Sequence, residues 1–142
     1  MKQLIILTVF FSFFLIFCDK NTNPQQECGP FSDPTSELEI IYPSPNDQFT
    51  AGEIINIQWK INSRRISKVN LSVSVNNGLK FYDILSTMLV PDDHEIECMN
   101  VNWEIGKMND NSQIIVKDTT LLLMISDYDG ETSEIVQLKV KK

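Results

Sequence analysis

Cysteine, histidine and basic residues are scarce in this chain of 142 residues. It has three cysteines and one histidine, and its 12 Lys and Arg residues stand against 19 Asp and Glu. Three cysteines are too few for a scaffold that depends on several disulfides. The formal net charge of −7 repels phosphate backbones, and the one basic cluster, Arg64-Arg65, is typical of a charged hairpin tip. We therefore expect no nucleic-acid partner.

Recognisable catalytic and metal-binding motifs are also missing. The single histidine, His94, cannot form a Ser–His–Asp triad without a nucleophile motif such as G-x-S-x-G, and none is present. Its acidic neighbours in 91–98 match no known metal-ligand spacing. In Asp127–Glu131 the glycine is the fourth residue, whereas a helix-flanked calcium loop places it sixth. We interpret 91–98 as an acidic, solvated loop that enters a strand and Asp127–Glu131 as a hairpin turn. We expect a protein that is not an enzyme and has no metal and no cofactor.

A secretory leader occupies the first 17 residues. Lys2 precedes an apolar run from Leu4 to Phe17, which only Thr8 and Ser12 interrupt. As a helix this run would measure about 21 Å, against roughly 30 Å for the hydrocarbon core of a bilayer. A signal peptide over residues 1–17 therefore fits the sequence better than a permanent transmembrane helix.

The apolar run ends at Cys18, where the chain turns polar. Leu15-Ile16-Phe17-Cys18 resembles a bacterial lipobox, although Phe17 stands where that family prefers Gly, Ala or Ser. No Ala occurs before Ala51, and the leader has no small-x-small site for the ordinary signal peptidase. The resemblance implies that Cys18 becomes an acylated N-terminus, which anchors the protein to a membrane of a bacterial cell envelope. We expect the outer membrane or the cell surface; an uncleaved anchor and a soluble secreted form are the alternatives.

Residues 18–37 are expected to hold the lipidated Cys and a flexible tether, because they are rich in Asn, Pro, Gln and Ser and offer little to bury. Cys28 lies in this tether, and Cys98 lies in the domain that follows. Outside the cytoplasm an even pair of cysteines suggests a disulfide. The bond would close a loop of about 70 residues and stabilise the fold by on the order of 4 kcal/mol. The sequence leaves open whether the two cysteines pair or stay as free thiols.

From Leu38 onward, apolar and polar residues alternate with a period of two. In the clearest run, Ile55–Ile61, every second side chain is Ile or Trp and the others are polar, as a half-buried antiparallel strand requires. Asn77-Gly78 predicts a two-residue hairpin turn, and Trp59 and Trp103 occupy inward positions typical of a core. Similar runs cover 38–42, 69–75, 81–85, 101–105, 121–125 and 136–140. The pattern predicts an all-β fold, an Ig-like antiparallel β-sandwich of seven to eight strands over residues 38–142, after the N-terminal signal helix.

Two segments carry a resemblance to a known family. Tyr42-Pro43-Ser44-Pro45 followed by Ala51–Trp59 resembles the opening motif of an Ig-like domain found in fungal Ser-Thr-rich, GPI-anchored cell-wall proteins and in bacterial surface proteins. Asn102–Ile105 and Leu121–Asp127 look like later strands of that domain, and the likeness covers most of 38–140. The resemblance implies a sandwich fold and an envelope or cell-wall setting, and it supplies no catalytic residues.

These observations predict a membrane-anchored envelope lipoprotein that presents a single Ig-like domain, without catalysis, for interaction with a protein or a cell-surface polymer. A carbohydrate-binding module is the alternative, with Phe81, Tyr82 and Tyr128 as candidate ligand platforms. Adjacent strand residues face opposite sides, so at least one of Phe81 and Tyr82 should be buried. A small hydrolase with paired carboxylates is the less favoured third hypothesis.

Overall fold

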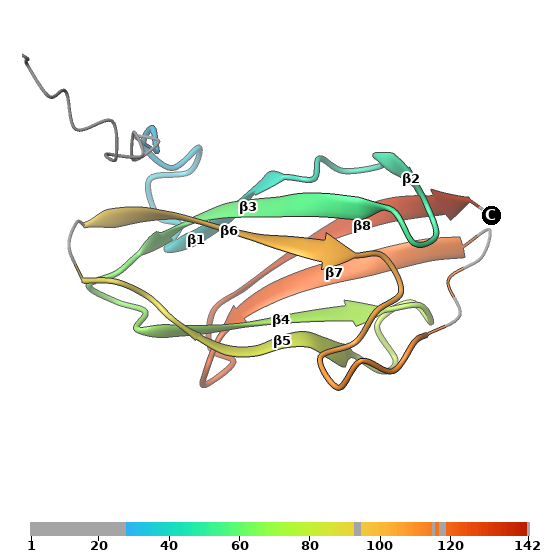
Figure 1. Cartoon of the computed structure of the whole chain (residues 1–142). Coiled ribbons are helices and arrows are strands. Elements are labelled where there is room, and N and C mark those ends of the chain that lie inside the picture. Colours follow the sequence, from blue (N-terminus) through green and yellow to red (C-terminus); the bar gives the residue numbers. More distant parts are fainter. Residues whose placement is uncertain (1–27, 93–94, 115, 117–118, 142) are drawn as a thin grey trace, which may run out of the picture.

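The computed structural model describes residues 28–92, 95–114, 116 and 119–141, which fold into eight strands without a helix (Figure 1). This confirms the predicted all-β fold and the number of strands. The strands are β1 (Leu38–Tyr42), β2 (Gln48–Thr50), β3 (Ile54–Asn62), β4 (Lys68–Ser74), β5 (Tyr82–Leu89), β6 (Ile96–Glu104), β7 (Thr119–Asp127) and β8 (Ser133–Lys141).

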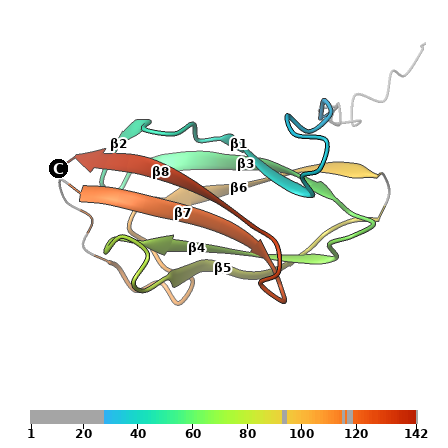
Figure 2. The ribbon, with the colours of Figure 1, turned by 180° about the vertical axis from the view of Figure 1, so that it is seen from behind.

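The strands form two sheets that face each other, as Figures 1 and 2 show from opposite sides. One sheet has the order β1-β3-β6, and the other has the order β2-β8-β7-β4-β5. The chain crosses from the first sheet to the second between β1 and β2, so its first two strands contribute to both sheets. All strand pairs are antiparallel except β2 with β8. This order defines an Ig-like β-sandwich.

The core lies between the two sheets and is built by the alternating side chains of the central strands. Trp59 is fully buried and Trp103 is 5% exposed, which confirms their predicted place in the core. Each large apolar side chain removed from water contributes about 1.5–3 kcal/mol. The other fully buried core residues include Ile57, Ile61, Val69, Leu71, Val73, Leu121, Leu123, Ile125 and Leu138.

The turn at Asn77-Gly78 has the predicted left-handed backbone, but it does not join two strands directly. Both residues have positive φ values, 57° and 84°. However, β4 ends at Ser74 and β5 begins at Tyr82, so the prediction of a two-residue hairpin is wrong. The Ser74 hydroxyl oxygen accepts a hydrogen bond from the Gly78 amide (2.9 Å). This side chain closes the turn inside a longer loop, in place of the main-chain pairing of the two strands.

β6 begins earlier than the sequence predicts. The sequence predicts a strand over 101–105 after an acidic loop, but Ile96 already pairs with Asn62 and Glu97 pairs with Ile61. Glu97 occupies an inward position of the strand and is 8% exposed. An acidic residue at an inward position hides the period-two pattern, so only the second half of the strand was visible in the sequence.

Candidate functional site

A row of carboxamide side chains covers the outer face of the three-stranded sheet. Asn56 pairs with Asn102, and Gln58 pairs with Asn100, on the neighbouring strands β3 and β6. The period of two that points Ile57 and Trp59 into the core turns these amides outward. The Asn56 amide nitrogen donates to the side-chain oxygens of Asn102 (2.8 Å) and Asn100 (3.2 Å), and Gln58 donates to Asn56 (2.8 Å).

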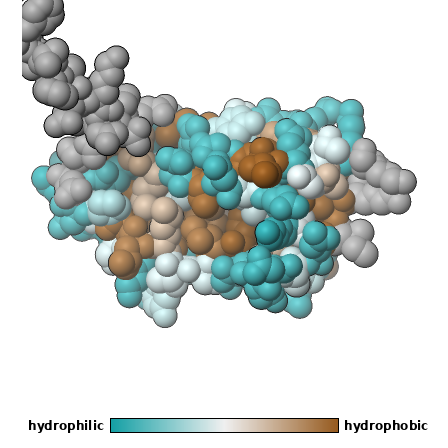
Figure 3. All heavy atoms as spheres, in the orientation of Figure 1, coloured by the Kyte–Doolittle hydropathy of each residue, from teal (hydrophilic) through white to brown (hydrophobic). Residues whose placement is uncertain are grey.

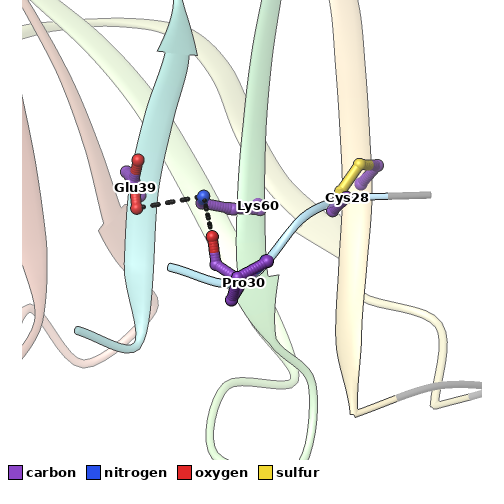
Figure 4. The surroundings of a disulfide bond; sticks show 5 residues. Cys28, Pro30, Glu39 and Lys60 are labelled. Carbon is purple, nitrogen blue, oxygen red and sulfur yellow. Dashed lines mark hydrogen bonds and ion pairs between the residues drawn. A yellow bond between two sulfur atoms is a disulfide. The ribbon is translucent and has the colours of Figure 1, made fainter. Parts of the chain in front are cut away.

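Lys60 continues this row on β3, but it is only 7% exposed because the segment before β1 lies over it. Its ammonium group donates to the backbone oxygen of Pro30 (2.6 Å) and forms an ion pair with Glu39 Oε2 (3.2 Å). The same ammonium lies 5.5 Å from the centre of the Phe31 ring. Figure 4 shows Lys60 reaching between Glu39 and Pro30. A buried ammonium needs such partners, because an isolated one would lose its hydration without compensation.

The Glu39 carboxylate holds the same segment from β1. It accepts hydrogen bonds from the Ser32 amide (2.7 Å) and the Ser32 hydroxyl (2.6 Å). Burial raises the pKa of Glu39, but the hydrogen bonds from Ser32 and from Lys60 outweigh burial and hold the pKa below its ordinary value. The carboxylate therefore stays ionised at neutral pH, where it accepts hydrogen bonds from Ser32 and forms the ion pair with Lys60.

A disulfide joins the start of the described chain to β6. The structure brings the two cysteines singled out in the sequence together: Cys28 and Cys98 are bonded, their Cα atoms are 5.6 Å apart and 70 positions separate them (Figure 4). Cys98 lies directly opposite Lys60 in the register of β3 and β6. The covalent bond and the polar contacts therefore act on adjacent positions of one sheet face.

We call these groups the N-terminal clamp. Its members on the segment are Cys28, Pro30 and Ser32, and its members on the sheet are Cys98, Lys60 and Glu39. Residues 28–32 belong to the stretch that the sequence assigns to a flexible tether, yet they are attached to two strands. Sequence reasoning missed Lys60 and Glu39. The signal was their place on two neighbouring strands, where Lys60 lies opposite Glu39 in the antiparallel register.

The remaining catalytic and metal candidates do not converge. His94 lies outside the described residues. Within the part of the chain that the structure describes, no three His, Cys, Asp or Glu side chains are placed to hold a metal ion. Asp127–Glu131 forms the tight connection between β7 and β8, in which the Gly130 amide donates to the Asp127 oxygen (3.3 Å). The sequence interpretation of this segment as a turn is confirmed.

The three aromatic residues weighed for carbohydrate binding do not form one platform. Phe81 and Tyr82 are both partly buried, and Tyr82 packs against the core. Tyr82 pairs with Val73 near the end of β4, whereas the amide of Tyr128 donates to the backbone oxygen of Lys68, where β4 begins (3.1 Å). Tyr128 alone is largely exposed, at 59%. One exposed ring does not provide the stacked surface that this alternative requires.

Cys18 and the leader lie outside the described residues. Over residues 28–92, 95–114, 116 and 119–141, no helix is long and apolar enough to cross a membrane.

Comparisons with known proteins identify no family. No protein-family model matches the chain, and no curated protein matches it. A solved engineered protein is similar over 74% of this chain, with 9% identity and a TM-score of 0.44; this chain spans 20% of its length. The fibronectin(III)-like modules of Clostridium thermocellum CbhA are similar over 73% of this chain and 94% of theirs, with 20% identity and a TM-score of 0.41. The Ig-like assignment rests on the strand order itself.

Proposed function

We propose that this chain is a lipid-anchored protein of the bacterial cell envelope. It presents a single Ig-like domain, without catalytic activity, for interaction with a protein or a cell-surface polymer. The observation that carries the proposal is the position of the N-terminal clamp. The apolar leader ends at Cys18, and only ten residues later Cys28 is bonded to β6.

The clamp sets how far the domain reaches from an acylated Cys18. Ten fully extended residues span at most about 35 Å. A flexible chain of that length has a root-mean-square extension of about 17 Å. Without the clamp, the free tether would run from Cys18 to the start of β1 at Leu38, twice as many residues. The clamp therefore holds the domain close to the membrane surface, with the outer face of the three-stranded sheet attached to the anchored end.

The chemistry of the clamp supports a role without catalysis. Its carboxylate, its ammonium and its two sulfur atoms all make contacts that fasten the segment to the sheet. A nucleophile or general base must instead be available to a substrate in a pocket. Glu39 and Lys60 are best explained as structural residues, and the domain as a module that binds through its surface.

Metabolic labelling with a palmitate analogue tests the anchor. We expect label on the wild-type protein and on a Cys28→Ala variant, which changes a cysteine that the proposal does not acylate. We expect no label on a Cys18→Ala variant, which should also keep its leader. A Cys18→Ala protein that is labelled as strongly as the wild type would contradict the proposal, and so would a wild-type protein that carries no label.

A further inference from the structure

The two sheets of the sandwich have four edge strands, and three of them are protected against pairing with another chain. β2 has only three residues, and β1 has five residues and a bulge between Ile40 and Tyr42. Short strands and bulges are the devices by which natural proteins blunt the edges of their sheets.

β5 is protected in a different way. Its pairing with β4 is interrupted, and Thr87 has a positive φ of 56°. The side chain of Asn70 accepts a hydrogen bond from the displaced Thr87 amide (2.8 Å). Asn109, in the loop after β6, covers the edge by donating its amide to the Asp83 oxygen (3.0 Å) and its side chain to Ser86 (3.0 Å).

β6 is neither short nor bulged, and its two charged side chains, Glu97 and Glu104, are both acidic. It has nine residues, contains no Lys and no Pro, and pairs with β3 residue by residue from Glu104 to Ile96 without a bulge. Among the described residues, no strand is bonded to its second edge. A long, regular edge of this kind presents free backbone donors and acceptors to another strand.

Apolar side chains line the gap next to this edge. Figure 3 shows hydrophobic atoms gathered in a band between β6 and the strands β4 and β5. Ile84 and Met88 of β5 and Val101 of β6 are partly buried hydrophobic residues that pack against the core. Near the end of β6, a hollow of about 310 Å³ is lined by Ile84, Trp103 and Met108, among others. A strand added to β6 would cover this band.

We propose that β6 pairs antiparallel with β6 of a second copy of this chain, about a two-fold axis at Asn100. The pairing joins two three-stranded sheets into one sheet of six strands. Asn100 is the middle residue of the strand, so Asn100 faces Asn100, Met99 faces Val101, and Ile96 faces Glu104. This register places no two like charges opposite each other, although the whole chain carries a net charge of −7.

The amides at the edge are suited to self-pairing. Asn100 and Asn102 each accept a hydrogen bond from Asn56 through the side-chain oxygen. Neither side-chain nitrogen donates to a described residue, and both residues are exposed. A carboxamide carries both donors and an acceptor. Facing copies of Asn100 can therefore donate to each other's oxygen, as a charged side chain at this position could not.

The two-fold axis also explains why a second copy fits the apolar band. Strands that pair antiparallel in one sheet are related by an axis perpendicular to the sheet. Both second sheets then lie on the same side, and the apolar bands next to the two β6 edges face each other (Figure 3). The pairing requires only the folded domain. The dimer can therefore form, or be disproved, whether or not Cys18 carries a lipid.

Cysteine cross-linking in membranes tests the pairing with a matched pair of variants. Directly opposite Cα atoms lie about 4.5–5.5 Å apart, which is within reach of a disulfide. Asn100→Cys should therefore give a dimer of twice the chain mass after mild oxidation of the full-length protein. Asn56→Cys changes an amide of the same row on β3, where the two copies of the residue would be about 20 Å apart, and it should stay monomeric. Mass spectrometry of the product identifies the linked peptides.

A second measurement is sedimentation equilibrium of the full chain in detergent. Asn100→Lys places two ammonium groups at the axis and should raise the dimer dissociation constant by about tenfold. Three results would overturn the proposal: a wild-type protein that sediments as a monomer with no Asn100→Cys cross-link, equal cross-linking of both cysteine variants, or a cross-link from Asn100→Cys to a different protein. The last result would assign the edge to a heterologous strand.

Discussion

Removal of the disulfide between Cys28 and Cys98 is the sharpest perturbation of the N-terminal clamp. The bond joins positions that are 70 residues apart. Closing a loop of this length restricts the unfolded chain, and the loop-entropy relation gives a loss of on the order of 4 kcal/mol when both cysteines become serine. Small domains are stable by about 5–15 kcal/mol in total. The double variant should therefore lose a large part of its free energy of unfolding.

Urea unfolding followed by tryptophan fluorescence measures this loss, because Trp59 and Trp103 are buried in the folded protein. Wild-type protein under a reducing agent is the matched control, since it loses the bond without a change of residue. Hydrogen exchange adds a local readout: the Ser32 amide, which donates to Glu39, should exchange faster in the double variant. A loss below about 1 kcal/mol in both the variant and the reduced wild type would refute the loop-entropy reasoning.

Three further predictions concern charge and burial. Lys60→Met removes the partner of Glu39 and should lower the free energy of unfolding by about 1–3 kcal/mol in urea; a Glu39→Gln change in the same chain should restore part of it. Burial and the neighbouring Glu39 carboxylate raise the pKa of Glu134 above its ordinary value, so ionisation of Glu134 disfavours the folded state. Glu134→Gln should therefore raise the melting temperature at pH 7, and this gain should vanish below about pH 4, where both states are protonated; equal gains at both pH values would contradict it. Trp103→Phe should cost about 1 kcal/mol more than Trp59→Phe in thermal unfolding, because the Trp103 indole donates to a backbone oxygen (2.8 Å), whereas the Trp59 indole has no partner among the described residues.

The sandwich could be predicted because alternation is a local signal. The run of apolar residues around Trp59 identifies β3, and the first predicted strand, 38–42, has the same bounds as β1. In a half-buried strand, consecutive residues alternate between the buried and the exposed face. Such a strand can therefore be recognised in the sequence without knowing which strand it pairs with. The all-β class and the tryptophans of the core followed from this pattern alone.

β2 and the pairing around β5 could not be predicted in the same way. β2 has three residues, only Phe49 of which is buried, and its partner β8 lies far away in the sequence. A strand so short shows no period, and its pairing depends on the finished sandwich. The interruption in β5 likewise depends on Asn70, a residue of another strand whose side chain meets the displaced Thr87 amide.

The clamp was hidden for a related reason. Its segment, 28–32, has the polar and Pro-containing composition of a tether, and no pattern in it indicates that it binds to a sheet. Ser32 is held because Glu39 lies next to it, and Glu39 is in place because β1 pairs with β3. Composition predicts whether a segment can build a core, but it does not predict whether an existing sheet will hold that segment.

Peptide mapping of the non-reduced protein from the envelope fraction tests most directly whether a clamped Ig-like domain is held close to a lipid on Cys18. Trypsin should release an acylated peptide from Cys18 to Lys20, together with residues 21–60 and 81–107 joined through one disulfide. A mature protein that begins at Met1, or that carries an unmodified Cys18, would contradict the lipid anchor. Recovery of 21–60 and 81–107 as separate peptides with free thiols would contradict the clamp.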